Sequence, residues 1–160
     1  MEYLTKEDIV LINRKTIKRH GGNFVSPFNF LNEPPLDYLV DAVQAKMFGN
    51  PVYPEIYEKA GVYMFNIISN HVFQDGNKRT GLGAALLFLN LNDFQLRHKL
   101  KKISKNKAKT IPEKGESNTE ILIEFTLELA AGKISLEECQ KWFKENISSV
   151  IKIHIQLFDG

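Results

Sequence analysis

The sequence predicts an all-α fold, a compact bundle of helices packed around one buried central helix. Apolar residues recur at helical spacing in several segments, and clusters of Gly, Pro and Asn separate those segments. The stretch Lys78–Leu91 (KRTGLGAALLFLNL) is apolar nearly all round, as expected of a helix at the centre of a helical domain. The chain has 160 residues, of which 43% are hydrophobic, and this suits one domain with one core.

The first half of the chain is expected to form three helices before the central one. In chain order we expect a helix with Thr5 as N-cap that ends at His20–Asn23, a loop over Phe24–Leu36, and helices over Leu36–Phe48 and Pro54–Asn70. Within the central helix, Gly81 and Gly83 lower the helix propensity. Their presence predicts that another backbone or a ligand approaches closely there.

The second half begins with a basic stretch. Arg97–Lys109 holds seven Lys or Arg and no acidic residue, and the polar residues to Asn118 continue it, so we expect a linker over 97–118. The run lacks interleaved aromatic residues, which favours a solvated linker over a nucleic-acid-binding surface. Capping-box patterns at Ser117 and Ser135 predict helices over 118–131 and 136–147. The tail over 148–160 contains Ile151–Leu157, whose strict alternation predicts a strand.

Composition excludes several classes of protein. The formal net charge of +2 is too small to dictate a partner, and the single cysteine, Cys139, rules out an intrachain disulfide framework. We find neither a signal-peptide pattern nor an apolar stretch of membrane-spanning length, so a soluble cytoplasmic protein with no membrane partner is expected. The four histidines lack metal-ligand spacing, and neither a Walker-type phosphate loop nor an H-E-x-x-H helix occurs.

The residues that carry chemistry lie between the third helix and the central one, in the ten residues HVFQDGNKRT from His71 to Thr80. His71 continues the apolar stripe of the preceding helix, which predicts an inward-pointing imidazole suited to a general base. Phe73 is expected to anchor the loop in the core, and Asp75 suits a hard cation such as Mg²⁺. Gly76 allows a tight turn. Asn77, Lys78, Arg79 and Thr80 then lie at the start of the buried helix, where free N–H groups and the helix dipole favour an anion. Together these residues indicate phosphoryl or nucleotidyl transfer.

The same residues resemble the loop of the Fic/Doc family, H-x-F-x-[DE]-[AG]-N-[GK]-R, at every defined position. The resemblance implies a Fic-like helical bundle with a small flap and a catalytic domain over residues 1–147. It places the flap, which aligns an extended segment of the target, at Phe24–Leu36.

Two positions select a branch of that family. Fic enzymes that transfer AMP usually have glycine after the asparagine and a second arginine three residues beyond the first, whereas this chain has Lys78 and Leu82. Lysine there is similar to the Doc, or death-on-curing, toxins. That branch implies transfer of the γ-phosphate of ATP to a hydroxyl on a protein of the translation machinery.

The resemblance assigns a role to each residue of the loop. His71 would be the general base, Asp75 would hold Mg²⁺, and Phe73 and Thr80 would be structural. The phosphates of ATP would be bound by Gly76, Asn77, Lys78 and Arg79.

Control is expected to come from a partner. Many Fic proteins inhibit themselves with a [ST]-x-x-x-E-[GN] helix, but no glutamate here has Ser or Thr four residues before it. The resemblance to Doc therefore implies an antitoxin that inserts a helical segment beside the active site. Two other functions stay open, a Fic-like AMP transferase and a non-catalytic domain that binds a partner or nucleic acid.

Overall fold

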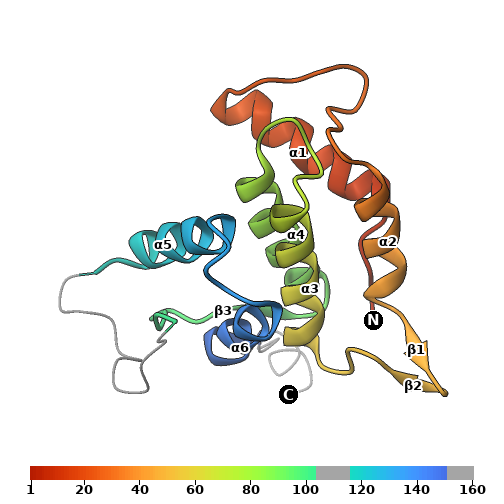
Figure 1. The fold of residues 1–160 in the computed structure, drawn as a ribbon. Helices are drawn as coiled ribbons and strands as arrows, with labels where there is room; N and C mark the ends of the chain where they lie inside the picture. Colours follow the sequence, from red (N-terminus) through yellow and green to blue (C-terminus); the bar gives the residue numbers. More distant parts are fainter. Residues whose placement is uncertain (104–115, 151–160) are drawn as a thin grey trace, which may run out of the picture.

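The computed structural model describes residues 1–103 and 116–150, and Figure 1 shows their arrangement. The helices in this part of the chain are α1 (Lys6–His20), α2 (Pro34–Ala42), α3 (Ile56–Ser69), α4 (Asn77–Leu91), α5 (Asn118–Ala130) and α6 (Leu136–Asn146). The strands are short: β1 (Lys46–Met47), β2 (Asn50–Pro51), β3 (Phe94–Leu96) and β4 (Ile147–Ser149). The predicted mostly helical bundle is confirmed.

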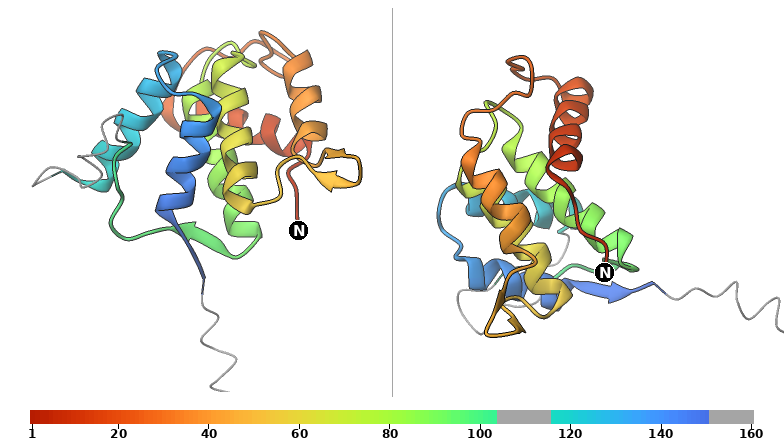
Figure 2. Two further views of the ribbon diagram at one scale, coloured as in Figure 1. Left: turned by 60° about the horizontal axis from the view of Figure 1, so that its bottom comes forward. Right: turned by 90° about the vertical axis from the view of Figure 1, so that its right-hand side faces the viewer.

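Helices α3 and α4 lie side by side at the centre, with α1 and α2 to one side and α5 and α6 to the other (Figures 1 and 2). The glycines of α4 make this close packing possible. A Cβ atom added at Gly81 would lie 2.7 Å from Cγ1 of Ile68, and one at Gly83 would lie 3.2 Å from Cγ2 of Ile12. The predicted close approach is thus confirmed, and the neighbours are α3 and α1.

Local sequence explains where most helices begin. The Thr5 side chain accepts from the Asp8 backbone N–H while Asp8 returns a bond to Thr5, which forms a complete capping box. Ser135 and Glu138 form the same pair at α6. Helices α5 and α6 follow their predicted ranges to within one residue at each end.

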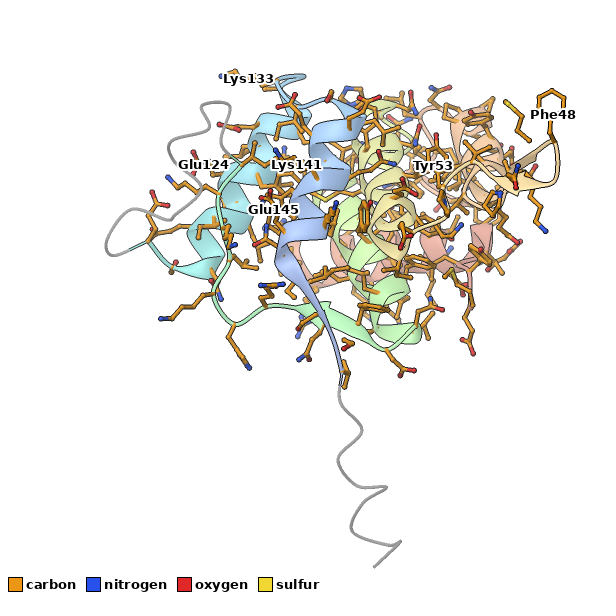
Figure 3. The ribbon with its side chains drawn as sticks, turned by 90° about the horizontal axis from the view of Figure 1, so that it is seen from below. Phe48, Tyr53, Glu124, Lys133, Lys141 and Glu145 are labelled. Atoms are coloured by element: carbon orange, nitrogen blue, oxygen red, sulfur yellow. The ribbon has the colours of Figure 1, made fainter. Side chains whose placement is uncertain are left out.

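The predicted helix over Leu36–Phe48 is wrong in its second half. Helix α2 begins earlier, with Pro34 and Pro35 in its first turn, and ends at Ala42. A hairpin of β1 and β2 follows, and its two turn residues, Phe48 and Gly49, both have positive φ (51° and 81°). Phe48 is 97% exposed at the tip of the hairpin, away from the helices (Figure 3).

The other two strands follow the C-terminal ends of two helices: β3 follows α4, and β4 follows α6. β3 pairs antiparallel with β4, and Leu96 lies opposite Ile147. The predicted strand over Ile151–Leu157 and most of the basic linker lie outside the described residues. Among the described helices, none combines the length and the apolar character that crossing a membrane requires.

Candidate active site

The loop from His71 to Gly76 connects α3 to α4 at one end of the molecule, at the top of Figure 1. The segment that follows α1 reaches the same end. The hairpin and the β3–β4 pair lie at the other ends of these helices. The predicted catalytic residues are therefore grouped at one pole of the bundle.

His71 lies just beyond α3, which ends at Ser69 with Asn70 as C-cap. Its backbone is left-handed (φ 46°), and its side chain is exposed. The predicted position on the apolar stripe of the helix is therefore wrong, because the chain turns away after Asn70. A non-glycine residue held in this conformation is uncommon, and such residues are concentrated at functional sites.

The flap segment is paired with the loop. Phe30 and Phe73 form an antiparallel bridge, and their rings stack with centroids 5.6 Å apart. The N–H groups of Leu31 and Asn32 both donate to the carbonyl of Val72, at 2.9 and 3.0 Å. Phe73 is fully buried, as predicted for the residue that anchors the loop. The position of the loop thus depends on the flap segment as well as on the two helices.

Asn77 closes the loop on itself. Its Oδ1 accepts from the N–H of Phe73 at 2.9 Å, and its Nδ2 donates to the carbonyl of the same residue at 2.8 Å. Both ends of the side-chain amide are therefore used inside the loop. A phosphate at this position would meet the backbone N–H of Asn77 rather than its side chain.

The start of α4 is arranged as an anion site. Gly76 is the N-cap in a left-handed conformation (φ 78°), and no side chain caps the first turn. Lys78 and Arg79 are exposed, and neither forms an ion pair within the part of the chain that the structure describes. Free N–H groups, the positive end of the helix dipole and two positive side chains thus lie together.

Asp75 is held by the backbone on both sides. Its Oδ2 accepts from the N–H of Asn23 at 2.9 Å, and its Oδ1 accepts from the N–H of Gly76 at 2.7 Å. These bonds lower the pKa of Asp75, and the nearby charges of Lys78 and Arg79 lower it further. The carboxylate is therefore ionised at neutral pH.

The donor set around Asp75 fits a cation that also binds substrate. Each carboxylate oxygen keeps acceptor capacity beyond its one backbone bond, and the side chain is exposed. In the described residues, no group of three or more His, Cys, Asp or Glu side chains gathers to form a cage made of protein alone. Mg²⁺ is commonly bound by one or two carboxylates together with substrate phosphates, and Asp75 beside the α4 anion site meets that requirement.

Two buried amides that the sequence did not indicate support this loop, Asn13 of α1 and Asn29 of the flap segment. Asn13 donates from Nδ2 to the carbonyl of Asp75 at 2.9 Å and to Oγ1 of Thr80 at 3.0 Å. Asn29 donates to Oδ1 of Asn13 at 3.0 Å. Thr80, for which the sequence predicts a structural role, is fully buried. A polar Asn13 between Ile9 and Ile17, one turn from each on the buried stripe of α1, is the sequence feature that could have indicated it.

A groove of about 490 Å³ lies between α1 and the flap segment. Its lining is Lys6, Glu7, Val10, Leu11, Arg14, Phe28, Phe30 and Glu33. Leu11 and Phe28 are 47% and 48% exposed there. The groove thus presents apolar side chains to solvent beside the loop.

Known proteins that are similar to this chain belong to the family that the loop motif resembles. The model of the family described as the Fic/DOC family matches residues 3–89, from the start of the chain through most of α4. "Toxin Doc" of Mycolicibacterium smegmatis is 35% identical over 95 residues, which cover 59% of this chain and 68% of that protein. "Protein kinase doc" of Escherichia phage P1 is 28% identical over 97 residues, which cover 60% of this chain and 72% of that protein.

Proposed function

Because the chain belongs to the Fic/DOC family, we propose that it is a Doc-type toxin that transfers the γ-phosphate of ATP to a hydroxyl on a translation protein. The family and the kinase named among its relatives support a transferase activity that uses a nucleotide. The observation that carries the finer proposal is the start of α4, where N–H groups without a side-chain cap lie beside Lys78 and Arg79, which form no ion pair with any described residue. Those groups suit the charge that builds up on a phosphoryl group during transfer.

In the proposed reaction, each loop residue has one task. His71 takes the proton from the attacking hydroxyl, whose oxygen forms a bond to the γ-phosphorus. The bond from that phosphorus to the oxygen bridging the β- and γ-phosphates breaks, and ADP leaves with the electron pair. Lys78, Arg79 and the N–H groups from Asn77 onward stabilise the phosphate oxygens. Asp75 would hold Mg²⁺, which supplies further positive charge to the phosphates when bound.

The direction of the nucleotide depends on Lys78. A lysine side chain fills space that glycine would leave open to a phosphate, and it adds positive charge beside the transferring group. This choice favours γ-phosphoryl transfer over AMP transfer. The exposed His71 and the ionised Asp75 favour a catalytic role over a non-catalytic binding domain.

The test of the activity uses two labels. The purified protein is incubated with a bacterial lysate, Mg²⁺ and ATP labelled on either the α- or the γ-phosphate. We expect label on one translation protein from γ-labelled ATP only. Label from α-labelled ATP would instead identify an AMP transferase, and no transfer with either label would favour a binding domain.

For the partner, the relatives named as Doc toxins support a toxin–antitoxin pair. We propose that the antitoxin places an amphipathic helix in the groove between α1 and the flap segment. Leu11→Asp puts a charge in this groove, whereas Leu127→Asp puts one on α5 at similar exposure (47% against 52%). A co-expressed small protein that rescues growth from the wild type should fail against Leu11→Asp and succeed against Leu127→Asp. Equal rescue of both variants would contradict binding of the antitoxin helix in the groove.

A further inference from the structure

The amide of Asn13 is fully buried on a helix stripe that is otherwise apolar. Ile9 and Ile17 lie one turn to either side and are buried with it. A leucine there would leave the Asp75 carbonyl, the Thr80 hydroxyl and the Asn29 amide without this partner, and an unsatisfied buried polar group costs free energy. The polar side chain is therefore explained by the groups that it joins.

The partners of Asn13 come from three other segments of the chain. Its two N–H donors go to the Asp75 carbonyl of the loop and to the Thr80 hydroxyl of α4, at 2.9 and 3.0 Å. Its oxygen accepts from Nδ2 of Asn29 in the flap segment at 3.0 Å. One side chain of α1 thus fixes the loop, the first turn of α4 and the flap segment relative to one another.

Asn29 continues this connection back to the loop. Its left-handed backbone (φ 61°) suits asparagine better than most residues. Its carbonyl accepts from the N–H of Gln74 at 2.8 Å, and its Oδ1 accepts from the N–H of Val25 at 2.8 Å. The N–H of Gln74 and the carbonyl of Asp75 are therefore both held by the same pair of asparagines, the first by the Asn29 main chain and the second by the Asn13 side chain.

The hydrogen bonds of Asn13 and Asn29 hold the backbone on which the Asp75 carboxylate is carried. Its Oδ2 is bound by the N–H of Asn23, and a Cβ atom added at Gly22 would lie 2.9 Å from the same oxygen. The carboxylate is therefore packed against Gly22 and Asn23, the residues that connect α1 to the flap segment.

We propose that Asn13 is a positioning residue, which sets through its amide where the Asp75 carboxylate and the start of α4 meet the phosphates of the nucleotide. The inference rests on the proposed function for its consequence in catalysis. The arrangement of the loop can be measured without any transfer reaction.

The test compares two buried asparagines. Asn13→Asp keeps the size of the side chain but turns an oxygen towards the Asp75 carbonyl, so that two acceptors face each other. Asn146→Asp is the matched control. Asn146 is equally buried, bonds to Lys101 and Trp142 through the same amide atoms, and lies beside β4, beyond the far end of α4 from the loop.

We expect Asn13→Asp to weaken Mn²⁺-dependent binding of a non-hydrolysable ATP analogue by about 10- to 100-fold, the range seen when groups that orient a metal ligand are removed. Hydrogen exchange at the Gln74 amide should become about five- to tenfold faster in the protein without nucleotide. Phosphate transfer should fall in parallel. Asn146→Asp should lower the melting temperature comparably and leave all three loop measurements at wild-type values.

The inference is overturned if the two variants lose similar stability while Asn13→Asp binds the analogue and exchanges at Gln74 as the wild type does. If Asn13→Asp does not fold, Thr80→Val removes one partner of the same amide and should shift both measurements in the same direction, by less. An unchanged Thr80→Val would then count against the inference. If the wild type transfers no phosphate, the proposed kinase activity fails, while exchange and binding still decide the role of Asn13.

Discussion

The two ends of the α3–α4 pair use the same kinds of groups in opposite ways. At the β3–β4 end, Phe125, Trp142 and Phe143 pack into one aromatic cluster, with the first two rings stacked at 4.3 Å. Helix α6, which ends at β4, has its first turn closed by a complete capping box of Ser135 and Glu138. At the loop end, α4 begins without a side-chain cap, and the charged residues Asp75, Lys78 and Arg79 are exposed.

Each end also contains a fully buried asparagine. Asn146 ties its own helix to Lys101, whereas Asn13 ties together the loop, the flap segment and α4. The β3–β4 end thus uses its buried polar groups to complete the fold. The loop end leaves the N–H groups at the start of α4 and the charges of Asp75, Lys78 and Arg79 exposed, where a ligand can bind to them.

The largest expected effect separates chemistry from stability at the loop end. His71→Ala should lower phosphate transfer by about 10²–10⁴-fold, since a positioned general base contributes roughly that factor. Because His71 is exposed, the melting temperature should stay within the range of a surface substitution. His98→Ala, another exposed histidine just after β3, is the control and should keep full activity.

A substitution in the aromatic cluster should have the opposite effect, a loss of stability without a loss of activity. Trp142→Ala should destabilise the fold by about 3–5 kcal/mol, because Trp142 is 1% exposed and contacts two other rings. Thermal unfolding measures the loss. Activity per folded molecule should remain near wild type. A selective loss of transfer at a temperature where the variant is folded would break the proposed separation of the two ends.

Two glycines with left-handed backbones, Gly76 and Gly132, allow a comparison in which a smaller loss of stability is expected. Gly76 and Gly132 have nearly equal φ (78° and 75°), so alanine at either should cost about 1–2 kcal/mol of backbone strain. Only at Gly76 would the added Cβ meet neighbours, Ile17 at 3.0 Å and Asn13 at 3.1 Å. Gly76→Ala should therefore weaken nucleotide binding as well as stability, whereas Gly132→Ala should change stability alone. Equal binding by the two variants would contradict a role for the close packing under the loop.

The smallest expected effect concerns pH. The pKa of Asp75 is lowered on folding by the N–H groups of Asn23 and Gly76, so its ionised form stabilises the folded state. That contribution is fully present above the ordinary carboxyl pKa near 4 and is lost as the pH falls through the lower folded value. Unfolding of the wild type and of Asp75→Asn, followed from neutral to acid pH, should show a constant difference that shrinks only below about pH 4. A difference that shrinks above this pH would contradict the two backbone bonds.

The sequence allowed most of the fold, and the place of the proposed site between α3 and α4, to be predicted, because both depend on local patterns. Helical spacing located α1, α3 and α4, and capping-box patterns in the sequence located α5 and α6. One short motif placed His71 and Asp75 just before the central helix and Arg79 in its first turn. The hairpin was missed because Leu39, Val43 and Met47 keep helical spacing through it. Its turn uses a left-handed Phe48, which composition does not favour.

The amides of Asn13 and Asn29 could not be placed from local patterns at all. Asn13 and Asn29 bond to each other across 16 positions of the sequence, and Asn13 bonds to loop and α4 residues more than 60 positions away. These bonds depend on how the flap segment folds back onto the loop. The exposed position of His71 was missed for a related reason. The helix ends at Ser69 with Asn70 as its C-cap, and the left-handed residue after it is His71, so no glycine indicates the turn.

The proposed reaction is transfer of the γ-phosphoryl group of ATP to a protein hydroxyl by the His71–Thr80 loop. Mass spectrometry of a translation extract treated with the wild type and with His71→Ala, in the presence of ATP and Mg²⁺, tests it most directly. The proposed reaction predicts one acceptor protein whose Ser, Thr or Tyr side chain gains a single phosphoryl group with the wild type and none with the variant. An acceptor that gains AMP instead, or one modified equally by both proteins, would contradict it.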